Sequence, residues 1–312
     1  MISTDVAKAA SLLSKGELVA VPTETVYGLA ANALDPQAVS SIYTVKNRPR
    51  FNPLILHCAS TDEAKKYVLE WPKEADVLSK AFWPGSISIL LPKNDLVPDI
   101  ITAGSKDVVI RIPNHPLTLK LLASIDFPLA APSANISNTV SPTTATHVEQ
   151  SLGDQIGLVL DGGACSVGVE STIVAIKNNE VVILREGGVS QEDIKRTGLT
   201  VGINTSKEIQ SPGQLKKHYA TKKTLLIVDS IDEWINENLN SNAIALLYQE
   251  RDLEIESIIL SKNYNLAEIA NKLFHAMRKA DDSDADLILV EKIKQEGIGR
   301  AIADRLERAA TL

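Results

Sequence analysis

Four short stretches of the sequence combine hydroxyl, amide or cationic side chains with small residues, close to the ends of segments with strand-like patterns. They are residues 22–29, 46–53, 130–135 and 161–172. In open α/β sheets, ligands bind in the crevice outside the carboxyl ends of the strands. Small residues let a ligand approach the backbone closely, and polar side chains hold it. The four stretches therefore predict one binding site that is assembled from separated loops.

Three cations, Lys46, Arg48 and Arg50, lie where a helix should end and a strand should begin. Positive charge near a helix C-terminus is mildly favourable in itself. That effect does not explain two arginines beyond the end of the helix, with Pro49 and Pro53 restricting the path of the chain. A guanidinium held in this way can bind phosphate oxygens with two parallel hydrogen bonds. We therefore expect the loop to face an anionic ligand.

Hydroxyl side chains supply a second kind of contact. The hydroxyls are those of Thr25, Ser133, Ser141 and Ser171. Thr25 could merely cap a local turn, and Ser141 could be the N-cap of a helix that begins at residues 141–143. The same groups could hydrogen-bond a small polar ligand, and a helix N-terminus after Ser141 would attract an anion. Beside the cations, these donors suit a polyphosphate together with a small zwitterion.

The best-known phosphate and nucleophile motifs are missing from the sequence. It contains no G-x-x-x-x-G-K-[ST] loop, no G-x-G-x-x-G that opens a helix after a strand, no H-E-x-x-H and no G-x-S-x-G. No obvious Ser–His or Cys–His pair is present. The chemistry should then rest on positioning and charge stabilisation, with Lys46, Arg48, Arg111 and Arg185 as the main cations.

The composition indicates a globular chain. Apolar residues make up 44% and charged residues 23% of the 312 residues, which is close to the average of folded domains. The net charge of −7 gives no general attraction to nucleic acid. Two cysteines are too few for a disulfide framework. Because no apolar run approaches the ~20 residues of a membrane span, and the first residues lack a signal-peptide pattern, we expect a cytoplasmic protein that contacts no membrane.

Helix-like and strand-like patterns alternate through the first part of the chain. We expect helices over residues 4–15, 35–47, 62–70 and 116–125, and strands over residues 18–21, 53–58, 86–91 and 107–112. Residues 171–176 and 181–185 should form a hairpin around Asn178 and Asn179. Alternating helices and strands that end in a hairpin predict a mixed α/β sheet rather than an all-parallel one.

Residues 199–222 interrupt this pattern and contain few large apolar side chains. The segment is basic and is either a solvated tether or a functional loop. A second α/β unit follows, with expected strands at 224–228, 243–248, 255–260 and 286–290 and helices at 266–279 and 298–309. Since 312 residues exceed what one hydrophobic core usually serves, we divide the chain into 1–198, 199–222 and 223–312. The last part should be a small Rossmann-like domain.

In this order, the motifs resemble those of the YrdC family, and specifically of its two-domain branch, the L-threonylcarbamoyladenylate synthases. The similar segments are residues 21–29, Lys46-x-Arg48 with Ser133-x-Asn135, residues 168–174, and the linker residues 211–213 and 218–220. The resemblance implies an α/β fold: a twisted mixed-sheet YrdC-like domain with a large cavity, then the Rossmann-like domain. Residues 199–222 would cover the active site.

The resemblance also implies a reaction. L-threonine, bicarbonate and ATP would give threonylcarbamoyl-AMP and pyrophosphate, for the threonylcarbamoyladenosine modification of tRNA. Mg²⁺ would be carried by ATP rather than by a dedicated protein site, so no metal ligands are assigned. Downstream threonylcarbamoyl transferase proteins would be partners, and weak binding of tRNA is a further option.

Residue roles follow from the resemblance position by position. The threonine-binding set is Thr25, His57, Arg111, the backbone of Ala131, and Ser171. The ATP-binding set is Arg48, Asn52, Ser133, Ser141, Arg185 and Tyr219. The catalytic set is Lys46, Arg48, Ser133 and Asn135. Two positions depart from the family: Thr221 stands where proline is usual, and Asp107 stands where relatives tend to have threonine near the nucleotide.

Two other functions fit part of the pattern. One-domain relatives are associated with RNA binding, and Lys46, Arg48 and Arg50 could contact tRNA phosphates. Against this, neither part of the chain has the basic balance of a nucleic-acid-binding surface. Carbamoylating hydrogenase-maturation proteins share the fold, but they carry an acylphosphatase unit and zinc-finger cysteines that this sequence lacks.

Overall fold

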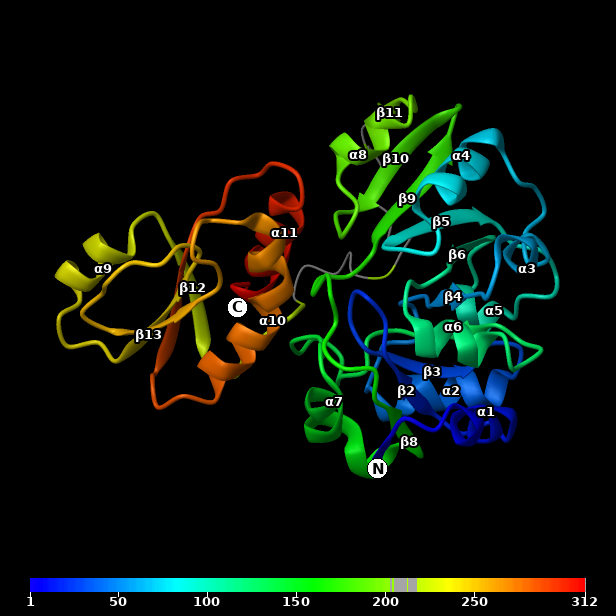
Figure 1. Cartoon of the computed structure of the whole chain (residues 1–312), viewed down its shortest axis with the longest axis horizontal. Coiled ribbons are helices and arrows are strands. Elements are labelled where there is room, and N and C mark those ends of the chain that lie inside the picture. Colours follow the sequence, from blue (N-terminus) through cyan, green and yellow to red (C-terminus); the bar gives the residue numbers. More distant parts are fainter. Residues whose placement is uncertain (203, 205–211, 213–217, 312) are drawn as a thin grey trace.

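The computed structural model describes residues 1–202, 204, 212 and 218–311. Figure 1 shows two units side by side, the larger one coloured blue to green and the smaller one yellow to red. The described residues form one sheet of 11 strands, from β1 to β11, and one sheet of four strands, from β12 to β15. The mixed α/β fold is therefore confirmed. Most of the predicted linker lies outside the described residues.

The larger sheet has the order β1-β8-β2-β3-β7-β4-β6-β5-β9-β10-β11. Its strands are β1 (Ile2–Ser3), β2 (Val19–Val21), β3 (Gly28–Asn32), β4 (Ile55–His57), β5 (Ile87–Pro92), β6 (Asp107–Arg111), β7 (Leu129–Ala130), β8 (Leu158–Leu160), β9 (Thr172–Lys177), β10 (Glu180–Arg185) and β11 (Val201–Gly202). β4 and β6 are parallel neighbours, with His57 and Arg111 opposite each other at their carboxyl ends. The pairing thus brings two predicted site residues together.

The helices of this unit surround the sheet. They are α1 (Val6–Ser14), α2 (Pro36–Val45), α3 (Thr61–Lys65), α4 (Lys73–Phe82), α5 (Asp99–Thr102), α6 (Pro116–Leu122), α7 (Ala145–Leu152) and α8 (Gln191–Arg196), with the 3₁₀ turn η1 (Gly153–Gln155). Asp35 caps α2 by accepting the N–H groups of Gln37 and Ala38, and Pro36 occupies the first turn. These local signals explain why α2 forms within the predicted range.

Asn178 and Asn179 form the tight turn between β9 and β10. Both residues have positive φ, 51° and 63°, a conformation that asparagine tolerates in two-residue hairpin turns. The antiparallel pairing places Glu180 opposite Lys177. The predicted hairpin is therefore confirmed, and its far end carries Arg185 to the pocket described below.

The sequence pattern does not predict β3, although this strand lies in the middle of the sheet between β2 and β7. Its sequence, Gly-Leu-Ala-Ala-Asn, has little intrinsic preference for strand. Small side chains are needed here because a Cβ on Gly28 would lie 3.1 Å from the Cβ of Ala131. Close packing, rather than local propensity, decides the structure of this segment.

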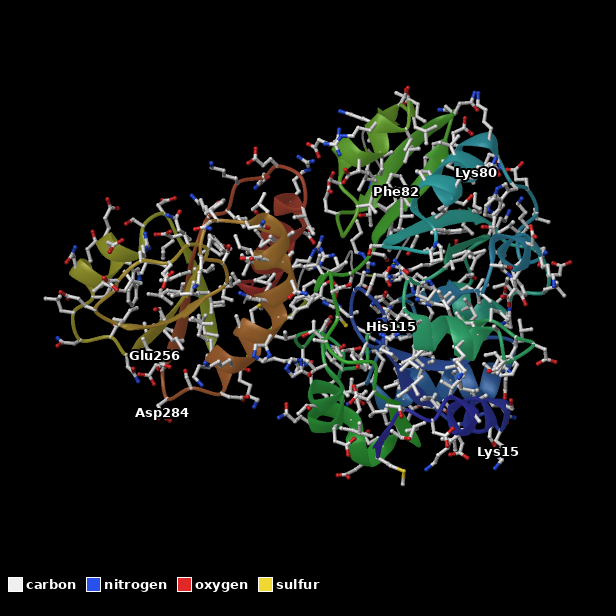
Figure 2. The ribbon with its side chains drawn as sticks, viewed as in Figure 1. Lys15, Lys80, Phe82, His115, Glu256 and Asp284 are labelled. Atoms are coloured by element: carbon white, nitrogen blue, oxygen red, sulfur yellow. The ribbon has the colours of Figure 1, made fainter. Side chains whose placement is uncertain are left out.

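The smaller unit contains a parallel sheet with the order β12-β15-β13-β14. Its elements are β12 (Thr224–Val228), α9 (Ile231–Glu237), β13 (Ala243–Leu247), β14 (Glu256–Ile259), α10 (Leu266–Asp281), β15 (Leu287–Glu291) and α11 (Gly299–Ala309). The four strands, α10 and α11 overlap the predicted ranges. Glu256 and Asp284 are exposed at the end of this unit (Figure 2). Among the described helices, none combines the length and apolarity of a membrane span.

Apolar side chains join the two units. Val26, Val140 and Val169 of the larger unit belong to the same buried cluster as Leu273 and Phe274 of α10. α10 and α11 are the elements that face the larger unit in Figure 1. Burial of this surface holds the two helices against loops that lead into the candidate site.

Gly168 allows the loop before β9 to contact α10. Its φ is +81°, and a Cβ would lie 2.5 Å from backbone atoms of Ala270 and Asn271. Gly198 has a similar φ of +83° but no atom within 4 Å of the added Cβ. We predict that Gly168→Ala lowers the melting temperature clearly more than Gly198→Ala. At Gly198 the added side chain costs only the ~1–2 kcal/mol of strain that the left-handed backbone conformation imposes on an L-residue. The prediction would be contradicted if the two variants had equal melting temperatures and if proteases cleaved the chain between the two units equally slowly in both variants.

Candidate active site

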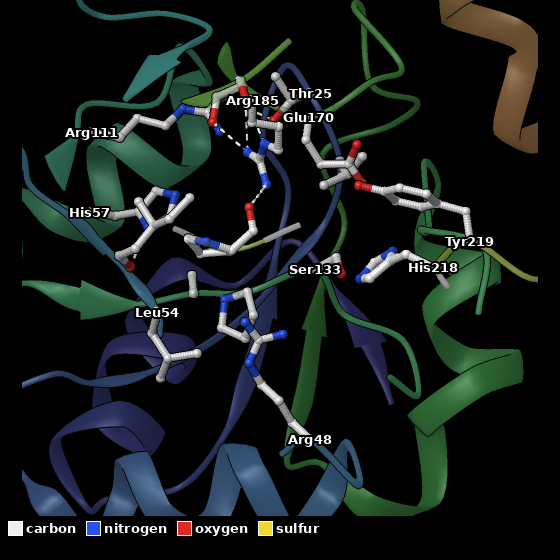
Figure 3. Close-up of a pocket in the computed structure, with 16 residues that line it drawn as sticks. Thr25, Arg48, Leu54, His57, Arg111, Ser133, Glu170, Arg185, His218 and Tyr219 are labelled. Carbon is white, nitrogen blue, oxygen red and sulfur yellow. Dashed lines mark hydrogen bonds between the residues drawn. The ribbon is translucent and has the colours of Figure 1, made fainter. Parts of the chain in front are cut away.

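A pocket lies where the predicted stretches converge in the larger unit (Figure 3). The residues assigned from the sequence that line it are Thr25, Arg48, His57, Arg111, Ala131, Ser133, Ser171, Arg185 and Tyr219. The other assigned residues, Lys46, Asn52, Asn135 and Ser141, are buried outside this lining. The structure thus brings the separated loops to one hollow, while the roles of these residues stay predictions.

The pocket is narrow in this conformation. Its free volume is about 50 Å³, which is room for a few water molecules, whereas pockets for drug-sized ligands measure ~300–1,000 Å³. Pro212, His218 and Tyr219 contribute to its lining. The large cavity expected from the sequence is therefore mostly filled, in part by residues of the segment predicted to cover it.

Arg48 enters the pocket from the loop that follows α2. The helix ends because Asn47 adopts a positive φ of 50°, as asparagine can at the residue after a helix, and the Arg48 N–H then donates to the Tyr43 carbonyl over 2.9 Å. The guanidinium donates to the carbonyl oxygens of Asn52 over 3.2 Å and Pro53 over 2.8 Å. Burial lowers the pKa of Arg48 to about 10, so it stays charged at neutral pH.

Lys46 braces the wall of the pocket instead of lining it. Its side chain is 1% exposed, and its ammonium donates to the carbonyl oxygens of Ser133 and Asn135. The Asn135 amide nitrogen in turn donates to the Thr139 carbonyl over 2.8 Å. Burial, and then the charge of Arg48, lower the pKa of Lys46 well below its usual value. Lys46 and Asn135 therefore fix the loop that carries Ser133.

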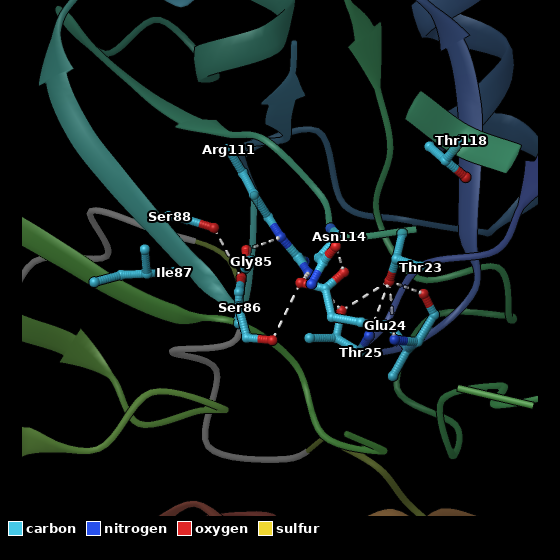
Figure 4. Close-up of polar contacts among 12 residues, drawn as sticks. Thr23, Glu24, Thr25, Gly85, Ser86, Ile87, Ser88, Arg111, Asn114 and Thr118 are labelled. Carbon is cyan, nitrogen blue, oxygen red and sulfur yellow. Dashed lines mark hydrogen bonds and ion pairs between the residues drawn. The ribbon is translucent and has the colours of Figure 1, made fainter. Parts of the chain in front are cut away.

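Arg111 lies in a polar cluster at the end of β6 (Figure 4). Its Nη2 donates to Glu24 Oε1 over 2.6 Å and to Thr25 Oγ1 over 3.0 Å, and its Nε donates to the Gly85 carbonyl over 3.2 Å. The other oxygen of Glu24 accepts the Asn114 N–H over 2.9 Å. Burial alone would raise the pKa of Glu24, but the charge and hydrogen bond of Arg111, together with backbone N–H groups, outweigh burial and hold this pKa below its usual value. No role for Glu24 was predicted from the sequence.

His57 faces the pocket as a neutral imidazole. Its side chain is buried, and Nδ1 lies 3.2 Å from the Ile55 carbonyl oxygen. Burial, followed by the charge of Arg111, lowers the pKa of His57 to about 3. Because a carbonyl only accepts hydrogen bonds, the tautomer with the proton on Nδ1 satisfies this contact. The Ala131 N–H also donates to the Ile55 carbonyl, over 3.2 Å.

Buried histidines give a prediction about stability at acid pH. Burial lowers the pKa of His57, His147 and His218 to about 3, 4 and 3, from an ordinary value of 6.5. Between pH 6.5 and 4 the unfolded chain therefore binds protons that the folded chain does not. The free energy of unfolding should fall as the pH decreases through this range, by up to ~1.4 kcal/mol per pH unit for each histidine.

Urea unfolding at pH 7, 6 and 5 measures this effect. We expect the decline to begin below pH 6.5, well above the range in which carboxylates titrate, and to be shallower in a His147→Gln variant. Stability that is constant from pH 7 to pH 5 would show that these histidines do not stay neutral in the folded protein.

Arg185, the last residue of β10, crosses the pocket to Ser171. Its Nε and Nη2 donate to the Ser171 carbonyl over 3.1 and 2.8 Å, and Nη2 also donates to Ser171 Oγ over 3.1 Å. The Ser171 hydroxyl lies 2.8 Å from that of Ser88 on β5. Among the described residues, neither Arg185 nor Arg48 forms an ion pair with a carboxylate. Within the described part of the chain, these two buried guanidinium charges thus lack an anionic partner.

Ser141 does not begin a helix, so that prediction is wrong. α7 starts at Ala145, and its N-cap is Thr144, whose hydroxyl accepts the His147 N–H over 3.2 Å. The Ser141 hydroxyl instead donates to Glu170 Oε1 over 2.7 Å. A hydrogen bond to a buried carboxylate is stronger than one to a backbone N–H at a helix start. This difference explains why the Ser141 hydroxyl binds Glu170 rather than capping α7. Glu170 lines the pocket and was also not assigned from the sequence.

Tyr219 and His218 close one side of the pocket. Tyr219 has a positive φ of 62°, and its ring stacks on Phe274 of α10 with 5.4 Å between centroids. The His218 ring lies 4.0 Å from that of Tyr219. His218 Nδ1 is buried without a hydrogen-bond partner among the described residues, as is Asn52 Oδ1. Unpartnered buried polar atoms are rare, so both are candidates for contact with a ligand.

The fold and the pocket together define the class: an α/β protein that holds buried cations at strand ends, suited to small anionic ligands. The chain belongs to the threonylcarbamoyl-AMP synthase family. The family model described as "Telomere recombination" (Sua5_yciO_yrdC) matches residues 11–187, and the model described as "Threonylcarbamoyl-AMP synthase, C-terminal domain" matches residues 189–311.

Curated relatives cover almost the whole chain. The threonylcarbamoyl-AMP synthase of Pyrococcus abyssi is 37% identical over 97% of this chain and 93% of its own length. That of Bacillus subtilis is 37% identical over 98% and 92%, and that of Schizosaccharomyces pombe 40% over 94% and 85%.

Solved structures agree with this assignment. The crystal structure of P. abyssi Sua5 complexed with L-threonine superposes with a TM-score of 0.91 at 37% identity, over 98% of this chain and 94% of that one. Full-length HypF in a phosphate- and nucleotide-bound form has a TM-score of 0.55 at 18% identity, over 96% of this chain and 42% of that one. The second likeness concerns the fold alone.

Proposed function

We propose that this protein is an L-threonylcarbamoyladenylate synthase. It joins L-threonine, bicarbonate and ATP into threonylcarbamoyl-AMP and pyrophosphate, for the threonylcarbamoyladenosine modification of tRNA. The observation that carries the proposal is one buried hollow in a chain of this family. There, two guanidinium groups with no carboxylate partner among the described residues, Arg48 and Arg185, lie beside hydroxyls and a third arginine that suit an amino acid.

The threonine half of the site is proposed at the ends of β4 and β6. Thr25 and Ser171 offer hydroxyls, and His57 offers a neutral imidazole. With a pKa of about 3, His57 hydrogen-bonds threonine rather than taking its proton. Since Nε and Nη2 of Arg111 already have partners, its Nη1 is the donor left for the threonine carboxylate. The backbone of Ala131 lines the same side.

The nucleotide half is proposed around Arg48 and Arg185. Phosphate oxygens would supply the negative charge that these two buried cations lack. Ser133 lines the pocket next to them, and Asn52 adds an unpartnered amide oxygen. Tyr219 and His218 would cover the nucleotide from the linker side. Ser141 reaches this half through Glu170.

The proposed mechanism uses no protein nucleophile. The neutral threonine amine takes up bicarbonate, releasing water, and a carbamate oxygen then attacks the α-phosphorus while pyrophosphate leaves. Arg48 and Arg185 hold the phosphates and stabilise the charge that develops on them, and Lys46 and Asn135 keep the Ser133 loop in place. A closed pocket would also exclude water from the labile carbamate and mixed anhydride.

Mg²⁺ is proposed to enter as part of the ATP substrate. The two carboxylates near the pocket are already engaged: Glu24 by Arg111, Ser86 and the Asn114 N–H, and Glu170 by Ser141 and Arg305. Among the described residues no cluster of three or more potential metal ligands occurs. Phosphate oxygens are therefore the better ligands for the ion.

We keep the division of the chain as a proposal: a catalytic unit of residues 1–198, a covering linker of 199–222 and a Rossmann-like unit of 223–312. The two sheets draw their strands from residues 2–202 and 224–291 respectively, so the larger sheet continues a few residues past 198 into the proposed linker through β11. Threonylcarbamoyl transferase proteins are the proposed consumers of the product, because a mixed anhydride of this kind is a reactive donor.

Pyrophosphate release tests the proposed function. Purified protein is incubated with MgATP, bicarbonate and each of a panel of amino acids. Pyrophosphate that requires threonine and bicarbonate together is the expected result, with serine and valine as matched controls for the hydroxyl and the methyl group. Pyrophosphate formed equally well without threonine would overturn the proposal. RNA binding that is tight and salt-sensitive without any turnover would favour the nucleic-acid-binding alternative instead.

A further inference from the structure

Arg305 of α11 is a buried cation that reaches the candidate site from the smaller unit. Its side chain is 0% exposed. Its Nε donates to Glu170 Oε2 over 2.7 Å, and its Nη2 donates to the Glu186 carbonyl over 2.8 Å. Its guanidinium carbon lies 5.2 Å from the centre of the Tyr219 ring. Arginine is almost never fully buried unless it is paired, and here both the carboxylate and the ring belong to the pocket lining.

Glu170 is the carboxylate that Arg305 neutralises. Its two oxygens are shared between units: Oε1 accepts the hydroxyl of Ser141, and Oε2 accepts Arg305 Nε. Arg185 lines the same pocket and forms no ion pair with any of the residues that the structure describes. An uncompensated charge on Glu170 would repel nucleotide phosphates and would attract Arg185 away from them, since both effects are strong at low dielectric.

We propose that Arg305 is a positioning residue for the nucleotide half of the active site, supplied by the smaller unit to neutralise Glu170 and to support Tyr219. This inference rests on the proposed function, because it concerns the binding of ATP. It makes the affinity for ATP depend on docking of the smaller unit. Movement of α11 away from the pocket would leave the Glu170 carboxylate among the phosphate-binding groups.

Neighbouring charges on α11 fit this arrangement. Asp304 also pairs with Arg305, but it is shared with Arg308, whose Nη2 lies 2.8 Å from its carboxylate. Arg300, five residues earlier in α11, pairs with Glu192 and lies 3.7 Å from the Glu186 carboxylate. Arg300 therefore joins the two units outside the pocket, whereas Arg305 joins them at the pocket.

Steady-state kinetics of Arg305→Gln test the proposal, with Arg300→Gln as the matched control. We expect the KM for ATP to rise by about 10- to 100-fold in Arg305→Gln, the effect of a unit charge a few ångströms away at an effective dielectric near 20. The KM for threonine should change by less than about threefold, and Arg300→Gln should keep both values close to wild type.

A charge-compensating double variant separates positioning from mere structure. If the role of Arg305 is to neutralise Glu170, then Glu170→Gln with Arg305→Gln should recover most of the affinity for ATP. Loss of ATP affinity in the double variant equal to that in the single one would overturn the inference. So would an unchanged KM for ATP in Arg305→Gln.

Two further outcomes, a variant that does not fold and a wild-type protein without activity, are also decided by these experiments. If Arg305→Gln does not fold, the double variant and Arg305→Lys carry the test: near-normal KM for ATP in the double variant, with an intermediate value in Arg305→Lys, supports the inference. A large loss in the double variant contradicts it. Wild-type protein that makes no threonine-dependent pyrophosphate would instead refute the proposed function, and that result is read before any variant is compared.

Discussion

Replacing Arg48 with glutamine should lower threonine-dependent pyrophosphate formation by about 10²-fold or more, the scale of losing one preorganised charge contact in an active site. Arg48 lines the pocket, and the described hydrogen bonds of its guanidinium go to backbone carbonyl oxygens of the same loop. Its charge is therefore available to phosphate. The same replacement at Arg50 should leave turnover within about twofold, as expected of an exposed side chain, because Arg50 points instead to the hydroxyl of Ser40 on α2.

The pair of variants separates the guanidinium in the pocket from the charge of the loop as a whole. Both remove one positive charge within three residues of each other, so a general electrostatic effect would reduce both activities alike. Melting temperatures establish whether Arg48→Gln is folded, and Arg48→Lys shows how much of the effect needs a planar fork rather than a point charge. Near-normal turnover in Arg48→Gln would remove this residue from the mechanism.

Local signals in the sequence predict much of the fold. Asp35 and Pro36 define the start of α2, and the pair Asn178-Asn179 defines the hairpin that carries Arg185. In the loop after α2, Pro49 and Pro53 restrict the chain directly after Arg48, the arginine that enters the pocket. Each of these features depends on a few neighbouring residues, and such features can be derived from spacing and residue type alone.

Long-range pairing accounts for what the sequence did not predict. β3 forms from a segment of low strand propensity because its small residues fit between two strands. Glu170 meets a cation that lies 135 residues away in the chain, and Glu24 meets one that lies 87 residues away. An acidic residue within a glycine-rich or threonine-rich motif gives no indication of its partner. The prediction that Ser141 begins a helix was wrong for the same reason, because its hydroxyl donates to the distant Glu170 carboxylate.

The charges around the pocket form two kinds of arrangement. Arg111 and Arg305 are each paired with a buried carboxylate, whereas the hydrogen bonds that Arg48 and Arg185 form with described residues go to neutral oxygen atoms. A cation that is paired with a carboxylate is fixed in place and can orient neighbouring groups, whereas a buried cation without such a partner favours the binding of an anion. This difference predicts different effects of substitution. Replacing Arg48 or Arg185 should lower activity with little loss of stability, whereas replacing Arg111 or Arg305 should lower both activity and stability.

Replacing Arg111 with glutamine should therefore lower both stability and activity. Its ion pair with Glu24 has an N···O distance of 2.6 Å and side-chain exposures of 5% and 6%. Removal of one partner leaves a buried charge, so the free energy of unfolding should fall by ~3–5 kcal/mol. Threonine-dependent turnover should fall by about 10²-fold or more, through a raised KM for threonine. Urea unfolding and steady-state kinetics measure the two effects separately.

The double variant Glu24→Gln with Arg111→Gln separates these effects, because it removes the buried charge without restoring the cation. We expect it to regain much of the stability, as paired neutral substitutions of buried ion pairs often do, while the KM for threonine remains high. Recovery of threonine binding together with stability would mean that Arg111 acts only as a structural partner of Glu24. The threonine carboxylate would then have to be bound by other groups, and the unpaired Arg185 beside Ser171 is the cation in the described pocket that could replace it.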